Sequence, residues 1–236
     1  MANPEVRPED GIVGYINDRT QGPDCALACP AATFYRNYLW NGNGQIGGEA
    51  RQMNLLAGVE RLLCSENNNN STHWSRENGY CMPHSVERLE AANCRIKELD
   101  RERLFDQFAV GIHWCTQVGS RPNQLVAQVF CSAMPVAYTN IASKHWEPLA
   151  SMALESCYEA TLSAAAILTY KTGLRQQVYL TMVGGGAFGN PRKWLVAAIR
   201  RALDTHANSP IDVHLVHFRK LDADFVSELP ATKATS

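Results

Sequence analysis

The feature that most constrains this chain is the stretch VYLTMVGGGAFGNPRKWLVAAIRRALD at residues 178–204, where an apolar run meets four glycines just before a helical pattern. Its first six residues predict a short strand buried on both faces, and residues 191–204 predict a helix with Asn190 as N-cap and Pro191 as first residue. Glycine has no Cβ, so such a loop adopts positive φ angles and lets a ligand approach the backbone. The start of the helix then favours an anion such as phosphate. The alternative is a plain tight turn in which Phe188 fills the core.

A second glycine-rich segment occurs earlier in the chain. Residues 26–40, ALACPAATFYRNYLW, are small and aromatic and predict one or two buried strands. The loop NGNGQIGGE at 41–49 follows, and a helix is expected from about Glu49 to Leu63. Because this repeats the order strand, glycine loop, helix, we expect both loops to contact one ligand from opposite sides.

The whole pattern predicts an α/β fold with a mostly parallel central sheet. With 236 residues, a single domain is expected. Its irregular parts are an N-terminal arm at 1–22, a polar insertion at 65–84 and a C-terminal tail at 219–236. Further strands are expected at 108–118, 125–138 and 211–218, and helices are expected from Ser85 onward and over 146–172.

Composition and charge exclude several classes of protein. A net charge of -1 and a pI near 6.6 give no basic field to attract nucleic acid. The first residues lack the apolar run of a secretory signal, and no stretch approaches the roughly 18 apolar residues of a membrane span. We therefore expect a soluble cytoplasmic protein with no nucleic-acid or membrane partner, whose eight cysteines are reduced.

Two cysteine patterns suggest other chemistry. The segment CMPH at 81–84, with His73 and Cys94 nearby, offers zinc ligands, but there is no paired CxxC, so we expect no metal. Cys115 stands two residues from His113, which would place a thiol and a base on one face of a strand. Two ordinary core residues share a face just as readily, so both interpretations of this pair stay open.

The loop GGGAFGN with its strand and helix, together with the earlier glycine loop after YRNY, resembles the macrodomain family, whose members bind ADP-ribose in a three-layer α/β/α fold. The resemblance is best over 175–218, follows the order of elements over 25–64 and 105–172, and is absent from the arm and the insertion. It implies that the later loop wraps the diphosphate and the distal ribose, with its aromatic side chain against the ribose, while the earlier loop closes over the same ribose. The ligand-binding residues implied in this way are Asn37, Gly44, Gly47, Gly48, Gly184, Gly185, Gly186, Ala187, Phe188, Gly189 and Asn190.

Four segments, CPAATFYRNYL, GIHWCTQV, QVFCSAMPVAY and GGGAFGN, resemble more narrowly an atypical branch of that family. The branch includes a bacterial effector hydrolase that removes ADP-ribose from arginine. It commonly carries acids where this chain has Cys115 and Gln117, so the resemblance leaves catalytic activity open.

The leading hypothesis is an enzyme: an ADP-ribosyl hydrolase that needs no cofactor and acts on ADP-ribosylated protein side chains, with arginine-linked substrates favoured. Cleavage at the anomeric carbon needs a fixed diphosphate, a positioned water and an acid or base. The catalytic candidates are Glu49, His113 and Gln45, with Asn37 orienting ribose or water. Each also has a plain structural role: a carboxylate in the first turn of a helix for Glu49, a core histidine for His113, and loop hydrogen bonds for the two amides.

Two other hypotheses stand beside the hydrolase. One is a non-catalytic reader that binds ADP-ribose through the same loops, and the other is a structural α/β domain whose loops bind nothing. Glu155 and Glu159, one turn apart on the long helix, are expected on its solvated face rather than as an acid pair.

Overall fold

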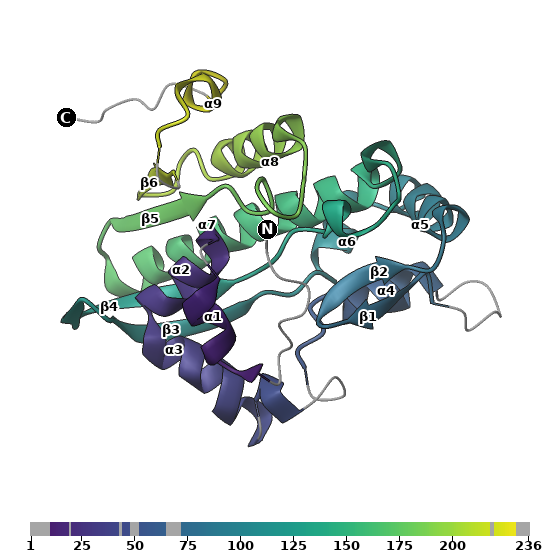
Figure 1. The fold of residues 1–236 in the computed structure, drawn as a ribbon. Coiled ribbons are helices and arrows are strands. Elements are labelled where there is room, and N and C mark those ends of the chain that lie inside the picture. The colour runs from purple at the N-terminus through teal and green to yellow at the C-terminus, as the bar shows by residue number, and fades with distance from the viewer. Residues whose placement is uncertain are drawn as a thin grey trace. The chain divides into compact units, whose positions relative to one another are not determined.

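The structure, a computed structural model, describes residues 10–18, 20–42, 44–47, 52–64, 72–217 and 220–229 (Figure 1). The chain divides into two compact units, Met1–Cys131 with Tyr138–Ile141, and Ser132–Ala137 with Ala142–Ser236. The first unit contains α1 (Val13–Asn17), α2 (Gln21–Ala28), α3 (Pro30–Phe34), α4 (Ala57–Cys64), β1 (Trp74–Glu77), β2 (Tyr80–Pro83), α5 (Val86–Glu98), α6 (Arg101–Phe105), β3 (Gly111–Val118) and β4 (Arg121–Phe130). The second unit contains α7 (Glu147–Thr172), β5 (Gln176–Thr181), α8 (Arg192–Thr205), β6 (Ile211–Val216) and α9 (Ala223–Ser227).

Helices and strands are mixed along the chain, as the coarse α/β prediction expects. In the described ranges the strands pair as three two-stranded sheets, β1–β2, β3–β4 and β5–β6. The first two sheets are antiparallel hairpins, whereas β5 and β6 are parallel, with Val178 opposite Val213. Parallel strands need a crossover, which α8 supplies here. A single, mostly parallel sheet in three layers stays a prediction.

The segment at 26–40 is helical, so the predicted strands there are wrong. α2 is followed by α3, which begins at Pro30, and then by a π-helical turn over Tyr35–Leu39. Proline is favoured in the first turn of a helix and alanine is the best helix former, and together they outweigh the strand preference of the aromatic residues. The rings of Phe34 and Tyr38, four residues apart, lie 4.8 Å from each other between centroids.

The segments expected to be irregular contain regular structure where they are described. The arm carries α1 and the start of α2, and the tail carries α9. In the polar insertion, β1 and β2 form a hairpin whose turn residues Asn78 and Gly79 have φ angles of 50° and 81°. An Asn-Gly pair is the preferred turn of a two-residue hairpin, so this part of the insertion had a local signal.

The predicted helices at Ser85 and at 146–172 are confirmed. Ser85 is the N-cap of α5, where its Oγ accepts a hydrogen bond from the Arg88 N–H at 3.3 Å. α7 has a proline in its first turn and ends at Gly173, which has a φ of 69°. The helix expected from about Glu49 corresponds to α4, which begins only at Ala57. Glu49 itself lies outside the described residues.

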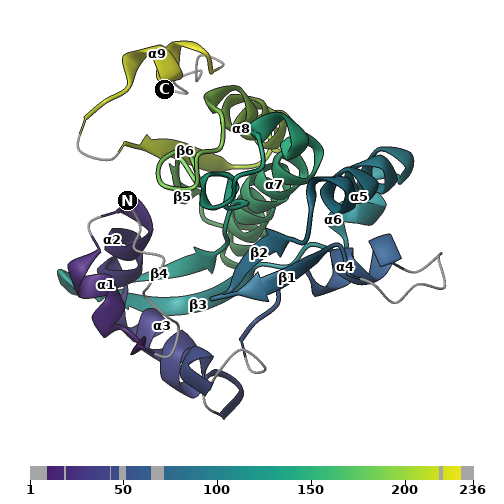
Figure 2. The same cartoon turned by 45° about the vertical axis from the view of Figure 1, so that its right-hand side comes forward.

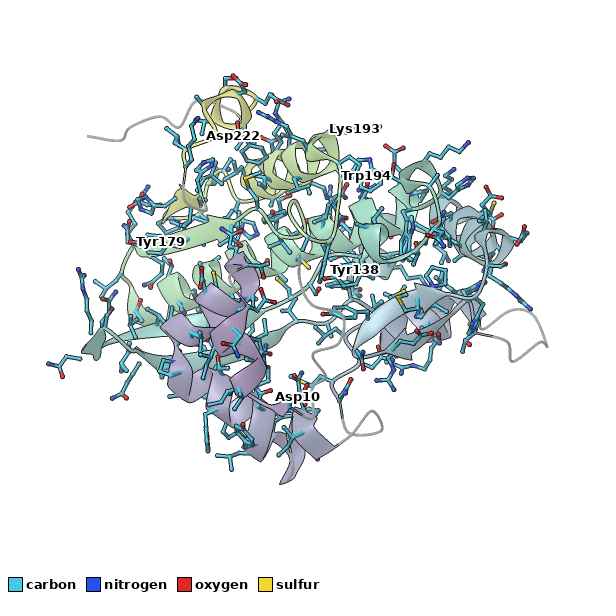
Figure 3. All side chains as sticks on the ribbon, viewed as in Figure 1. Asp10, Tyr138, Tyr179, Lys193, Trp194 and Asp222 are labelled. Carbon is cyan, nitrogen blue, oxygen red and sulfur yellow. The ribbon has the colours of Figure 1, made fainter. Side chains whose placement is uncertain are left out.

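In the second unit, α8 packs along α7, and β5 and β6 lie side by side (Figures 1 and 2). Val178 and Leu180 are buried, whereas Tyr179 between them is 64% exposed. The prediction that this strand is buried on both faces is therefore wrong. The outward face is polar and aromatic: Tyr179, labelled in Figure 3, stacks on His214 with ring centroids 5.0 Å apart.

The prediction that Glu155 and Glu159 lie on a solvated face of α7 is wrong for Glu155, which is only 8% exposed. Both carboxylates lie near the Arg201 guanidinium of α8, at 3.5 Å and 3.4 Å. One cation shared between α7 and α8 offsets the cost of removing the two acids from water.

Two further properties bear on the expected class of protein. All eight cysteines are free thiols in the structure. Within the described ranges, no helix combines the length and the apolar composition that a membrane crossing requires.

Candidate functional site

The glycine-rich loop between β5 and α8 folds back on itself through its own backbone. The Gly185 N–H donates to the carbonyl of Met182 at 3.1 Å, and the Gly189 N–H donates to the carbonyl of Gly186 at 3.0 Å. A third bond runs from the N–H of residue 190 to the carbonyl of Gly184 at 3.0 Å. The loop is therefore a closed turn.

Two glycines in this loop are required by packing. Gly184 and Gly189 have φ angles of 75° and 68°, in the region that side chains disfavour. A Cβ on Gly184 would overlap the Cβ of Ala133, and one on Gly189 would lie 2.8 Å from the Cβ of Ala137. Gly186 is different, because no atom lies within 4 Å of a Cβ placed there. Of the four glycines, Gly186 is the one that faces open space.

The Asn190 side chain holds the loop rather than capping α8, so the predicted N-cap is wrong. Asn190 is 4% exposed, and its Nδ2 donates to the carbonyls of Met134 at 2.8 Å and Gly184 at 3.2 Å. Pro191 is the N-cap, and α8 begins at Arg192. Because buried carbonyl groups need donors, the amide stabilises the packing of the loop against residues 132–137. The Met134 carbonyl that accepts this hydrogen bond lies 56 positions away in the chain.

The loop offers donors but no negative charge. In the part of the chain that the structure describes, the N–H groups of Gly186 and Ala187 have no protein acceptor. They precede α8, whose first-turn N–H groups carry a positive partial charge. Residues 182–191 contain no aspartate or glutamate. The arrangement is therefore suited to an anionic ligand.

Two basic residues stand at the start of α8, and both are paired with carboxylates. The positive charges of Arg192 and Lys193 are unfavourable at the positive end of the helix dipole, and each is paired with an acid from another element. Lys193 Nζ lies 3.1 Å from the Glu147 carboxylate, which also accepts a bond from Trp194 Nε1 at 2.9 Å. Lys193 and Trp194 are labelled in Figure 3.

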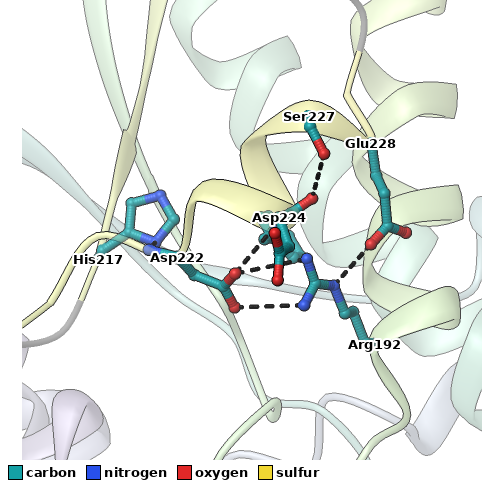
Figure 4. A network of polar contacts seen from close by, with 7 residues as sticks. Arg192, His217, Asp222, Asp224, Ser227 and Glu228 are labelled. Atoms are coloured by element: carbon teal, nitrogen blue, oxygen red, sulfur yellow. Dashed lines mark hydrogen bonds and ion pairs between the residues drawn. The ribbon is translucent and has the colours of Figure 1, made fainter.

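Arg192 is held by the segment around α9 (Figure 4). Its Nε lies 2.8 Å from the Glu228 carboxylate, and its Nη2 lies 3.4 Å from that of Asp222. The guanidinium carbon also lies 5.5 Å from the ring centroid of Phe225. Since Asp222 accepts a bond from the Phe225 N–H at 3.0 Å, it also caps α9.

Tyr158 on α7 fixes the strand end from which the loop departs, a role that the sequence analysis missed. Its buried hydroxyl donates to the carbonyl of Thr181 at 2.9 Å and accepts from the Val183 N–H at 3.0 Å. The position of Tyr158 among the apolar and small residues in the first half of α7 was the available signal. The pairing could not be read from the sequence because its partners lie 23 and 25 positions away.

The remaining loop residues named from the resemblance lie within this turn. The carbonyl of Phe188 accepts a bond from the Ala137 N–H at 2.9 Å, and its side chain is half-buried. Gly185 is exposed, although a Cβ there would lie 2.9 Å from Leu195. The expected contact between Phe188 and a ribose stays a prediction.

The earlier glycine loop belongs to the first unit, and only part of it is described. Asn37 is 1% exposed, and its Nδ2 donates to the Thr33 carbonyl at 2.8 Å, one helical turn back. Gly44, with a φ of 59°, packs so closely on the Asn37 backbone that a Cβ there would overlap it. Gln45 and Gly47 form a short 3-10 turn. The predicted residues Gly48 and Glu49 lie outside the described residues.

His113 lies near the start of β3 in an antiparallel hairpin, not in a parallel central strand. Its ring is half-buried and meets Tyr35 edge-on, with centroids 5.5 Å apart. The register of β3 shifts between His113 and Thr116, which interrupts the alternation that would place Cys115 beside the histidine. Cys115 is exposed on this irregular stretch.

Among the described residues, no group of three or more metal-binding side chains is positioned to hold a metal ion. Of the candidates in the CMPH segment, Cys81 is buried, and this burial raises the pKa of its thiol well above the ordinary value. His84 Nε2 lies 3.2 Å from the Thr72 hydroxyl, and His73 Nδ1 lies 3.1 Å from the Arg88 carbonyl. These contacts fit a structural role for the residues around the β1–β2 hairpin.

Comparisons of the chain with protein-family models, with curated proteins and with solved structures give no match. The functional assignment therefore depends on the residues themselves and on the motif resemblance described above.

Proposed function

We propose that this chain binds ADP-ribose through the loop at 183–190 and the first turn of α8. The observation that carries the proposal is the pair of N–H groups at Gly186 and Ala187, which have no protein acceptor in the described ranges and precede a helix N-terminus. A diphosphate supplies oxygen atoms for both donors and gains from the helix dipole. Arg192 and Lys193, in the same first turn, are already paired with carboxylates, so the donors and the helix dipole carry the proposed attraction. The half-buried ring of Phe188 then packs against the ribose.

The roles of the loop residues divide in this proposal. Gly184, Gly189 and Asn190 shape the turn through packing and hydrogen bonds, while Gly186 and Ala187 present the donors. The proposal extends to a three-layer α/β/α arrangement in which β5 and β6 belong to one central sheet. Its support is the parallel β5–β6 register with α8 as the crossover, since ligands of such sheets bind beyond the carboxyl ends of the strands.

Binding is supported better than hydrolysis. Cleavage of an ADP-ribosyl bond needs an acid or base beside the anomeric carbon, and residues 182–191 contain neither aspartate nor glutamate. The Asn37 amide, proposed to orient ribose or water, donates to the Thr33 carbonyl. The catalytic candidates Glu49, His113 and Gln45 all lie outside the segment 182–191 of the sequence.

Calorimetric titration with ADP-ribose, AMP and NAD tests the binding proposal. The informative variant is Gly186→Asp, because the new side chain enters open space without a strained φ and places a negative charge beside the two donors. The matched control Gly186→Asn adds the same bulk without the charge. We expect Gly186→Asp to lose at least about tenfold in affinity relative to Gly186→Asn, since bonds from N–H groups to an ionised acceptor are worth about 1.5–3 kcal/mol each.

Unchanged affinity in Gly186→Asp, with both variants unfolding at the wild-type temperature, would remove the loop from the binding site. Turnover is assayed separately on arginine-, serine- and glutamate-linked substrates. In a hydrolase, His113→Ala and Glu49→Ala lower kcat more than they weaken binding. A protein that binds ADP-ribose and releases none from any substrate is a reader.

A further inference from the structure

The side chain of Arg36, in the π-helical turn of the first unit, lies between two aromatic rings. Its guanidinium carbon is 4.6 Å from the ring centroid of Phe130 on β4 and 5.5 Å from that of Tyr15 on α1. Its Nη2 donates to the Tyr15 hydroxyl. Three separate segments of the chain therefore meet around one cation.

The described part of the chain supplies no anionic partner for this cation. Within the described ranges, no carboxylate pairs with Arg36, and its Nε is buried without an acceptor. Burial lowers the pKa of Arg36, which means that the surroundings disfavour the charged form. Cation–π contacts and one neutral hydroxyl offset only part of the cost of removing a guanidinium from water. The other partly buried arginines described above, Arg192 and Arg201, each have two carboxylates.

The neighbouring face of the β3–β4 hairpin also carries polar side chains. Gln128 lies two residues before Phe130 and opposite His113, so all three side chains are on one face. The Nε2 of Gln128 donates to the Cys25 carbonyl at 2.9 Å, while its Oε1 is buried without a donor. A ligand for this face needs negative oxygen atoms for Arg36 and a hydroxyl for Gln128.

We propose that Arg36, with Tyr15 and Phe130, forms a second anion site that takes a phosphate group, either as the free ion or as a phosphomonoester. At neutral pH a phosphate group carries both charged oxygens and, in part, a P–OH group, whereas a carboxylate offers no donor. Arg36 binds the oxygens through its remaining N–H groups, and its planar form suits a two-point contact. The site uses no residue of the loop at 183–190 and does not depend on ADP-ribose binding.

Protection from an arginine-specific reagent tests this site on the full wild-type chain. Phenylglyoxal labelling is followed by peptide mass spectrometry at increasing inorganic phosphate, with O-phosphoserine and acetate in parallel at equal ionic strength. We expect saturable protection of Arg36 by phosphate, by O-phosphoserine as well if monoesters fit, and none by acetate at the same concentrations. Arg175 is the internal control, because it is exposed and already paired with Asp212 at 2.7 Å.

Three outcomes overturn the proposal: Arg36 stays labelled at saturating phosphate, acetate protects it at lower concentration than phosphate, or it is not labelled even without phosphate. The last outcome would mean that the guanidinium is closed to any anion.

A thermal-unfolding series separates this site from the loop. In the Gly186→Asp background, which opposes an anion at the loop, we expect phosphate still to raise the melting temperature. Adding Arg36→Gln should abolish that rise, and adding Arg36→Lys should weaken apparent phosphate affinity by about tenfold, because the charge stays but the forked geometry is lost. A phosphate-dependent rise that persists in the Arg36→Gln double variant refutes the site. Loss of the rise in Gly186→Asp alone likewise refutes the site, because it would trace the stabilisation by phosphate to the loop.

Discussion

The Nε atom of Arg192 lies 2.8 Å from a carboxylate oxygen of Glu228, so the first residue of α8 is joined to the C-cap of α9. The same guanidinium lies near the carboxylate of Asp222, the N-cap of α9. One side chain therefore holds both ends of a short helix (Figure 4). An isolated helix of this length is unstable in water, so this contact and the burial of Phe225 must hold α9 in place.

Substitutions around Arg192 should lower the free energy of unfolding more, the more of these contacts they remove. Glu228→Gln removes one partly exposed ion pair, and we expect a loss of at most about 1 kcal/mol of unfolding free energy. Arg192→Met removes both pairs and the contact with Phe225, so we expect about 1–2 kcal/mol. Urea unfolding measures both values. Equal losses in the two variants would show that Asp222 and Phe225 gain nothing from Arg192.

Removal of one hydroxyl should loosen the strand end before the loop. Tyr158→Phe leaves the Val183 N–H and the Thr181 carbonyl without their shared partner, and we expect a loss of about 1–3 kcal/mol in urea unfolding. The control is Tyr170→Phe on the same helix, because Tyr170 is 91% exposed. If the two variants unfold alike, the Tyr158 hydroxyl does not stabilise the loop.

Gly184 and Gly186, two positions apart, should differ in how well they tolerate a methyl group. Gly184→Ala places a Cβ against Ala133 at a positive φ, so we expect a loss of at least about 1–3 kcal/mol. Gly186→Ala meets no atom within 4 Å and should change stability by about 0.5 kcal/mol or less. Thermal unfolding of both variants checks the contrast. A stable Gly184→Ala protein would contradict the packing described for this turn.

Alkaline pH should weaken the first unit through Tyr138. Burial, followed by the charges of Tyr80 and Asp18 and a hydrogen bond with Tyr80, raises the pKa of Tyr138 to about 12 from an ordinary value of 10.0. A raised folded-state pKa means that the neutral phenol is favoured in the folded protein. This contribution is complete below about pH 10 and is lost as the pH rises towards about 12. Tyr138→Phe has no proton to lose, so its stability in urea should fall less steeply over that range. An identical slope in the two proteins would refute this assignment.

Much of the local structure follows from the sequence because the signals are local. Ser85 and the proline and glycine at the two ends of α7 set helix boundaries through their own backbone and side-chain chemistry. The alternation of β5, α8 and β6 could be read in the same way. The Asn-Gly turn between β1 and β2 was equally local, although the polar composition around it suggested an irregular insertion.

The sequence by itself determined that a glycine-rich, acid-free turn precedes the helix at 192–205, because glycine content and charge are properties of the chain. Only the tertiary structure decided what each residue of that turn does. Gly184 faces Ala133 and Asn190 bonds to Met134, through contacts between segments about fifty positions apart, whereas Gly186 alone among the four glycines of the turn faces open space. The surroundings of Arg36, two aromatic rings and no carboxylate among the described residues, are likewise set by packing, since a sequence shows which charges exist but not which of them meet.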